Sequence, residues 1–195
     1  MVWLWILLGI LLIFLALGLA GFETACVRRE LPPQALTEEY LRGTSRAKWA
    51  EDFVFSSDWF YAQKPQTLRV MSYDGKMLSA RFLPREDAKG TILLFHGYRS
   101  SGLLDFGPEL EFLHRQGYNL LLCDQRAHGA SQGRYMTFGV RERYDVLSWV
   151  TYLAQMLGAE HPMFLSGMSM GASVTISRYF GAGDYARVSR AVHTN

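Results

Sequence analysis

Apolar and polar residues follow three different patterns along this chain of 195 residues. The first is an unbroken apolar run over residues 2–22, which contains no charged side chain. About 20 such residues suffice to cross a bilayer as a helix, whereas the apolar region of a signal peptide is normally about 7–15 residues long. We therefore expect an uncleaved transmembrane anchor. A cleaved signal peptide is the alternative, because Leu19-Ala20-Gly21 has the small residues of a cleavage site.

Basic residues after this run bear on the side of the membrane that the rest of the chain occupies. Arg28 and Arg29 come directly after the run, and Arg42 lies a little further on. Because Lys and Arg accumulate in the cytoplasmic flanks of membrane helices, this small excess favours a cytoplasmic position for the C-terminal domain.

The second pattern, over residues 23–65, is that of a connecting region with short amphipathic helices. Pro32-Pro33 cannot continue a helix, and Thr37 can cap a short one that begins at Glu38. A second amphipathic segment runs from about residue 46 to 61. We expect its aromatic side chains to pack on the C-terminal domain or on the membrane surface; these are Trp49, Phe53 and Phe60.

The third pattern is an alternation of strands and helices from residue 66 onward. Residues 68–72 and 78–82 alternate with period two around Asp74-Gly75, which predicts a hairpin. Continuous apolar runs predict parallel strands covered on both faces; they span residues 91–95, 118–123 and 163–165. Helices are expected at residues 108–115 and 144–157, the second with a stripe of Val146, Leu147, Val150 and Leu153. The order predicts an α/β fold.

Composition narrows the function classes without adding a site. Hydrophobic residues make up 49% of the chain, as in a protein with a folded core. A net charge of +2 without a basic stripe argues against a nucleic-acid partner. Cys26 and Cys123 lie far apart and predict neither a disulfide framework nor a metal site. We expect no metal, nucleotide or other cofactor.

A G-x-S-x-G pentapeptide, Gly167-Met168-Ser169-Met170-Gly171, comes after the last of these apolar runs. Residues 172–176 can open a helix after it, so the context is strand, sharp turn and helix, as a nucleophile elbow requires. At the start of such a helix, unpaired N–H groups and the helix dipole favour a developing negative charge. The pentapeptide therefore indicates a serine nucleophile.

Two other predicted strands also end in polar motifs. His96-Gly97-Tyr98-Arg99-Ser100-Ser101 comes after the strand at 91–95, and Asp124-Gln125-Arg126-Ala127-His128-Gly129-Ala130-Ser131 comes after the strand at 118–123. In open α/β sheets, ligands bind beyond the carboxyl ends of the strands. We therefore expect the three loops to meet at one site.

With these motifs, residues 66–176 resemble the α/β-hydrolase superfamily. The resemblance is greatest to the branch with serine-aminopeptidase-like and monoacylglycerol-lipase-like enzymes. That branch typically shows a His-Gly loop, an Asp-x-Arg-Gly-His-Gly-x-Ser stretch and the elbow. The chain departs from it once, with Ala127 where glycine is usual.

The resemblance implies a role for each motif. Ser169 would be the nucleophile, and the backbone N–H groups of Met170 and Tyr98 would form the oxyanion hole, where two fixed donors meet developing negative charge. His96 is expected to structure its loop rather than to act as the base. The second motif is expected to hold its turn through hydrogen bonds and an ion pair of Asp124, Arg126 and His128.

A serine hydrolase of this fold needs an acid and then a histidine after the serine. One strand-plus-helix repeat takes roughly 20–25 residues, so the acid should lie about two repeats beyond Ser169. Residues 170–195 have room for the elbow helix and one strand near 188–192, and Asp184 and His193 come too early. We therefore expect a C-terminally incomplete α/β-hydrolase domain at 66–195, after an anchor at 2–22 and a connecting region at 23–65.

Two functions remain open at this point. The first is a membrane-anchored serine hydrolase that cleaves an ester, amide or related acyl bond of a small-molecule or lipid-like substrate through an acyl-enzyme on Ser169, its acid and base missing from this chain. The second is a truncated, non-catalytic α/β-hydrolase-like protein that binds a ligand or associates with a membrane. A serine at the elbow excludes the aspartate-nucleophile chemistry of the same fold.

Overall fold

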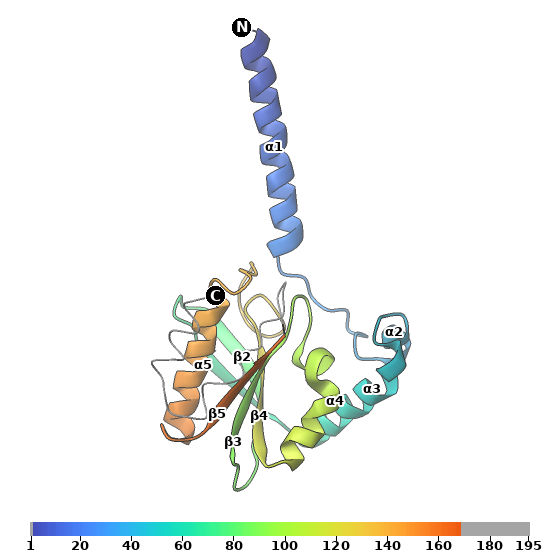
Figure 1. The fold of residues 1–195 in the computed structure, drawn as a ribbon, viewed down its shortest axis with the longest axis vertical. Coiled ribbons are helices and arrows are strands. Elements are labelled where there is room, and N and C mark those ends of the chain that lie inside the picture. Colours follow the sequence, from blue (N-terminus) through green and yellow to red (C-terminus); the bar gives the residue numbers. More distant parts are fainter. Residues whose placement is uncertain (1, 169–195) are drawn as a thin grey trace.

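The computed structural model describes residues 2–168, which form a mixed sheet covered by helices and one long helix that extends away from it (Figure 1). The strands are β1 (Gln66–Met71), β2 (Met77–Leu83), β3 (Gly90–Phe95), β4 (Tyr118–Asp124) and β5 (Met163–Gly167). The helices are α1 (Val2–Cys26), α2 (Glu38–Arg42), the 3-10 turn η1 (Ala47–Trp49), α3 (Ala50–Ala62), α4 (Gly102–Arg115) and α5 (Glu142–Leu157). Ser169, Met170, Asp184, His193 and the strand expected near 188–192 lie outside the described residues.

The sheet has the order β1-β2-β4-β3-β5. β1 and β2 form the expected hairpin, and β2 pairs with β4 in antiparallel register. The Ser72 hydroxyl closes the turn by donating to Asp74 and accepting from the Lys76 N–H, and Gly75 adopts a positive φ of 75°. β4, β3 and β5 are parallel, so their carboxyl ends lie along one edge. The predicted α/β-hydrolase fold is confirmed for this part of the chain.

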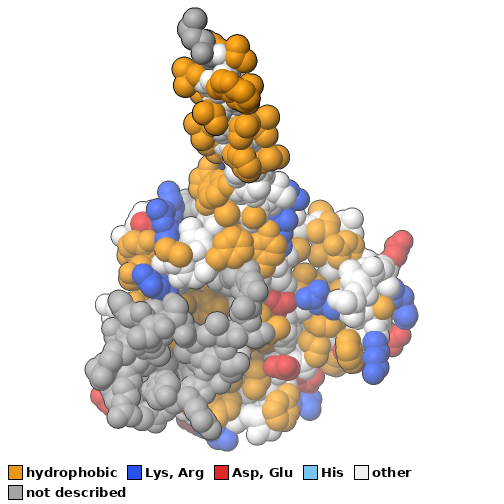
Figure 2. Space-filling view, turned by 45° about the horizontal axis from the view of Figure 1, so that its top comes forward, with side chains coloured by type: hydrophobic (Ala, Val, Ile, Leu, Met, Phe, Trp, Pro, Cys, Tyr) orange, Lys and Arg blue, Asp and Glu red, His pale blue; other side chains and the backbone are white. Residues whose placement is uncertain are grey.

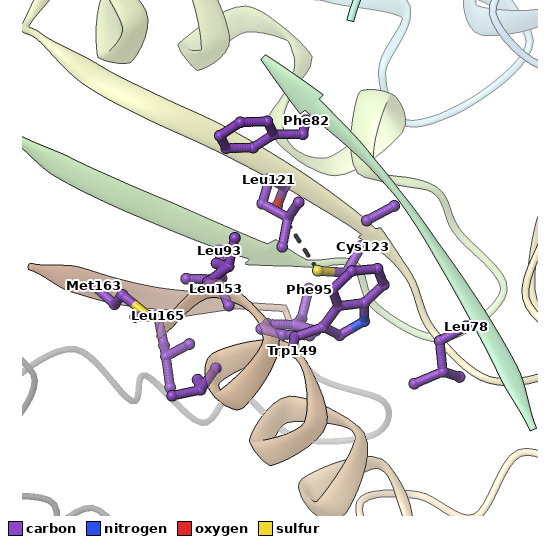
Figure 3. Packing of buried hydrophobic residues seen from close by; sticks show 12 residues of the cluster. Leu78, Phe82, Leu93, Phe95, Leu121, Cys123, Trp149, Leu153, Met163 and Leu165 are labelled. Atoms are coloured by element: carbon purple, nitrogen blue, oxygen red, sulfur yellow. Dashed lines mark hydrogen bonds between the residues drawn. The ribbon is translucent and has the colours of Figure 1, made fainter. Parts of the chain in front are cut away.

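Helix α5 covers one face of the sheet. Figure 3 shows the close packing between Trp149 and Leu153 of α5 and the strand side chains, among them Leu93 and Leu121. The predicted stripe on α5 is correct for Val150 and Leu153, which are buried, and for Val146, which packs partly buried against them. Leu147 does not belong to this cluster, whereas Trp149, which is only 1% exposed, does. Trp149 lies three residues after Val146 and four before Leu153, so the helical period itself places it on this face.

Helices α4 and α3 cover the opposite face. α4 begins six residues before the predicted start at Pro108, because the Ser101 hydroxyl caps it by accepting from the Leu104 N–H. Pro108 lacks the N–H that would bond to the Leu104 carbonyl, and the Arg46 side chain donates to that carbonyl instead, at 3.1 Å. The proline is therefore accommodated inside the helix.

Helix α3 packs against the sheet and contributes to its hydrophobic core. Phe60 is fully buried in a cluster with residues of β3, β4 and α4, and Phe53 is buried against Leu104. Trp49 is half exposed. Phe53 and Phe60 therefore pack on the C-terminal domain, which was one of the two expected outcomes, and not on a membrane surface. The cap at Thr37 is also confirmed, since its hydroxyl accepts from the Tyr40 N–H.

Helix α1 is long and apolar enough to cross a membrane, and none of its apolar window is buried against the described part of the chain. It extends four residues beyond the predicted apolar run, to Cys26. Its last turn contacts loops at the carboxyl edge of the sheet, so the helix is joined to the domain at a defined place.

We expect Phe60→Ala to lower the free energy of unfolding by about 3–5 kcal/mol, because it empties a fully buried aromatic site. Phe55→Ala, on the same helix, is the matched control: Phe55 is 63% exposed, and its loss should change stability by less than about 0.5 kcal/mol. Urea unfolding of the detergent-solubilised chain measures both. Equal, small changes would show that α3 does not contribute to the core.

Candidate active site

The candidate site lies at the carboxyl edge of the parallel strands. The loop after β3 (96–101) and the loop after β4 (125–140) face one another there, and β5 ends beside them. The N–H of Met168, the last described residue, donates to the Phe95 carbonyl at 2.9 Å. Ser169 therefore comes directly after a residue that is hydrogen-bonded to the end of β3. Ser169 and Met170 themselves lie outside the described residues.

The loop after β3 is held by side chains from two directions. The Gly97 N–H donates to Asp105 of α4 at 2.7 Å, and the Arg99 N–H donates to Nε2 of His128 at 3.2 Å. The Tyr98 N–H lies between these two amides and has no acceptor among residues 2–168. The loop thus fixes the backbone around Tyr98 while the N–H expected to serve the oxyanion hole bonds to none of the described residues.

Both ring nitrogens of His96 are engaged inside the protein. Nε2 accepts from the Gln125 N–H at 3.1 Å, so Nδ1 carries the proton and donates to the Gly97 carbonyl at 2.9 Å. Burial lowers the pKa of His96 below its usual value. A buried, neutral ring with both nitrogens bonded structures its loop, as expected from the sequence.

His128 has the reciprocal arrangement. Its Nε2 accepts from the Arg99 N–H, and its Nδ1 donates to the Arg126 carbonyl at 3.0 Å. The rings of His96 and His128 meet edge to face, with centroids 4.7 Å apart. Burial, reinforced by the neighbouring His96, lowers the pKa of His128 to about 4. Each histidine therefore accepts a backbone N–H from the opposite loop only because it is neutral.

Arg126 forms an ion pair, but with two carboxylates outside its own motif rather than with Asp124 as expected. Its guanidinium donates two hydrogen bonds of 2.6 Å to Asp145 of α5 and two longer ones, of 3.0 and 3.2 Å, to Asp74 of the hairpin turn. Burial opposes the charge of Arg126, but the bonds to Asp145 and Asp74 outweigh it and raise the pKa of the guanidinium. The bond from Arg126 lowers the pKa of Asp74 to about 2. The network joins the second motif to α5 and to the β1–β2 turn.

The rest of the second motif forms a compact turn. The Asp124 carboxylate accepts from the Ala130 N–H at 2.9 Å, and a Cβ on Gly129 would lie 2.5 Å from Asp124 Cγ. Glycine is therefore required at 129. Ala127 has a φ of 60°, in the left-handed region that glycine enters without cost. This conformation explains why glycine is usual at the position where the chain has alanine.

Two carboxylates that hold the site were missed from the sequence. Asp105 orients Gly97 and also accepts from the Ser100 hydroxyl, and Asp145 binds Arg126. Each lies in the first turn of a helix, where acidic residues are common for other reasons. Their positions in the sequence therefore do not distinguish them from ordinary helix-start acids. Among residues 2–168, no three side chains of the metal-binding types converge.

Comparisons with known proteins agree with this geometry. The sequence profile of the family described as "Serine aminopeptidase, S33" matches residues 86–194. The caffeoylshikimate esterase of Arabidopsis thaliana is 31% identical over 111 residues, which are 55% of this chain and 33% of that protein. The uncharacterized protein YqkD of Bacillus subtilis is 32% identical over 99 residues, or 49% of this chain and 31% of YqkD. The chain thus spans about a third of the length of these curated relatives.

Among solved structures, the esterase Pf2001 of Pyrococcus furiosus is similar, with 30% identity and a TM-score of 0.52. The similarity covers 57% of this chain and 46% of the esterase. The match confirms the resemblance drawn from the three motifs and the fold expected from them.

We expect Arg126→Gln to lower the free energy of unfolding by about 3–5 kcal/mol, because it leaves the buried Asp145 carboxylate without its partner. Arg42→Gln is the matched control, since it breaks an exposed pair with Glu38 and should cost no more than about 0.5 kcal/mol. Chemical denaturation at neutral pH compares the two variants. Equal costs would contradict a structural role for the Arg126 network.

Acid should destabilise the fold through His128. The unfolded residue takes up a proton near its usual pKa of 6.5, whereas the folded one does so only near 4. Between these values the unfolded chain holds more protons, so stability falls as the pH falls, by up to about 1.4 kcal/mol per pH unit. We expect a shallower loss in His128→Gln, which cannot titrate. Parallel slopes for the two proteins between pH 6.5 and 4 would overturn this assignment.

Proposed function

Because the chain belongs to the serine aminopeptidase S33 family of the α/β-hydrolase superfamily, we propose that it is a membrane-anchored serine hydrolase that cleaves an ester through an acyl-enzyme on Ser169. Its characterised relatives are esterases, so an ester is the acyl bond that we favour among those open to this fold. Since the chain covers about a third of the curated relatives, this activity is proposed for the whole protein.

The observation that carries the proposal is the state of the Tyr98 N–H. The amides on either side of it are bonded to Asp105 and His128, while Tyr98 has no backbone partner within residues 2–168. A fixed donor of this kind beside the end of β5 is what an oxyanion hole requires. We propose that Tyr98 and Met170 supply its two N–H groups.

The proposed mechanism begins at Ser169. Ser169 Oγ attacks the acyl carbon, its proton passes to a base, and the carbonyl oxygen becomes an oxyanion bound by the two N–H groups. Collapse of this intermediate breaks the acyl–oxygen bond, and the leaving alcohol takes the proton from the base. Water then releases the acid from Ser169. His96 and His128 do not serve as this base, because each uses both ring nitrogens inside the loops.

We propose further that α1 is kept as an anchor rather than removed as a signal peptide. The helix continues without a break past residue 22, and its last turn is bonded to the loops of the candidate site. The arginines at 28 and 29 favour a cytoplasmic position for the domain.

Fluorophosphonate labelling tests the proposal directly. We expect the native protein to be labelled on Ser169, and Ser169→Ala to abolish labelling and to lower ester turnover at least 1000-fold, because the nucleophile is lost. Ser166→Ala, three residues earlier on β5, is the control and should keep both. Melting temperatures should be nearly unchanged in both variants. Absence of labelling in native material would favour the non-catalytic alternative.

A further inference from the structure

The C-terminal end of α1 is capped by the two loops that form the candidate site. The last carbonyls of a helix have no partner within the helix itself. Here the Arg99 side chain donates to the Thr24 carbonyl, the Tyr98 hydroxyl donates to the Ala25 carbonyl at 2.9 Å, and the Met136 N–H donates to the Cys26 carbonyl at 2.7 Å. Tyr98 therefore contacts the helix through its side chain while its N–H belongs to the site.

A short antiparallel bridge extends this joint. Val27 pairs with Tyr135, and the Arg28 N–H donates to the Arg134 carbonyl at 2.7 Å. The Arg28 guanidinium also donates to the carbonyls of Gly129 and Ser131, inside the turn of the second motif. The helix end is thus bonded to both loops and cannot swing independently of them.

The length of α1 then fixes the height of the loops relative to a bilayer. At about 1.5 Å per residue, residues 2–22 cover about 31 Å, which matches a hydrocarbon core of about 30 Å. The last four residues of the helix add about 6 Å, close to the depth of one headgroup layer. Tyr98, bonded to Ala25, accordingly lies at the level of the lipid headgroups when α1 spans the membrane.

The surface around the helix end carries the basic and apolar side chains that suit contact with a headgroup layer. Residues 22–30, Tyr98, Arg99 and residues 134–143, here called the foot surface, contain six arginines and three glutamates. Glu23 pairs with Arg134 and Glu30 with Arg28, while Glu142 is buried and accepts from the Thr137 hydroxyl. Figure 2 shows basic and apolar side chains side by side around the base of the helix.

Apolar side chains on the foot surface remain exposed, and no element within residues 2–168 covers them. Phe22 contacts Tyr135, with ring centroids 5.3 Å apart, and Phe138 stacks on Tyr98. Between 38% and 64% of each side chain in this group is exposed: Phe22, Tyr135, Phe138 and Val140. Aromatic rings beside arginines are the usual composition of a protein surface at a membrane interface.

We propose that the foot surface lies on an anionic phospholipid leaflet and holds the mouth of the site at headgroup level, so that the acyl substrate is an ester that reaches the site from the bilayer. The contact with lipid depends on α1 spanning the membrane. The statement about the substrate rests on the proposed hydrolase function.

Depth-dependent quenching tests the contact with lipid. The full chain is reconstituted in vesicles of phosphatidylcholine and phosphatidylglycerol (7:3), with an NBD fluorophore on Phe138→Cys in a Cys26→Ser background. Phe112→Cys, near the far end of α4, is the matched control, since Phe112 is 62% exposed. We expect a headgroup nitroxide lipid to quench the label at 138 at least twofold more than the label at 112. Equal quenching would overturn the proposal.

The charge of the surface is tested in the same vesicles. We expect Arg29→Glu/Arg134→Glu to reduce the quenching at 138 to half or less, because the reversed charges repel the anionic lipid. Arg69→Glu/Arg115→Glu, an equal change on exposed residues elsewhere, should leave it unaltered. Identical behaviour of the two pairs would show that anionic lipid is not the partner.

The source of the substrate is tested by placing an ester either in the vesicles that hold the protein or in separate vesicles. We expect 4-methylumbelliferyl oleate to be hydrolysed at least tenfold faster in the shared vesicles. Equal rates, with Ser169 still labelled by fluorophosphonate, would overturn the bilayer route and leave the hydrolase function intact. No labelling and no hydrolysis would instead reject the proposed function. The quenching result would still decide whether the foot surface contacts lipid.

Discussion

Two hydrogen bonds between the loops after β3 and β4 are the constraint on which the rest of the site depends. His96 accepts the Gln125 N–H, and His128 accepts the Arg99 N–H. Each bond joins a ring in one loop to the backbone of the other, so neither loop can move alone. Both bonds need a neutral ring, because a charged imidazole has no free lone pair to accept with. Burial supplies that neutrality by lowering the pKa of each histidine.

The supports of these loops come from distant parts of the chain. Asp105 on α4 holds the first loop, and Arg126 ties the second to α5 and to the hairpin turn at Asp74. The charges of Asp105 and Arg126 are both paired, and the histidines between them stay neutral. A buried guanidinium bonded to two carboxylates is costly to desolvate, and its stabilising effect depends on complete pairing. The arrangement makes the site rigid, but it lowers the stability of the fold in acid.

The fold and the motifs could be predicted from the sequence, whereas their supports could not. Apolar runs such as residues 91–95 and 118–123 report burial on both faces of a strand, and this signal is local. The partners of Arg126 are far from it in sequence: Asp145 looks like an ordinary helix-start acid, and Asp74 looks like an ordinary hairpin-turn residue. The early start of α4 was missed because Arg46, remote in sequence, replaces the hydrogen bond that Pro108 cannot make.

The end of α1 could not be predicted from its apolar run, because its supports are also remote in sequence. The run ends at residue 22, but the helix continues to Cys26, because the site loops provide donors for its terminal carbonyls. A helix end satisfied in this way is coupled to its donors: a change in the position of α1 is transmitted to Tyr98 and Arg99 through hydrogen bonds rather than through a flexible linker. The Arg99 guanidinium also places positive charge at the negative end of the helix dipole. Helix α1 and the loop after β3 therefore form one structural unit.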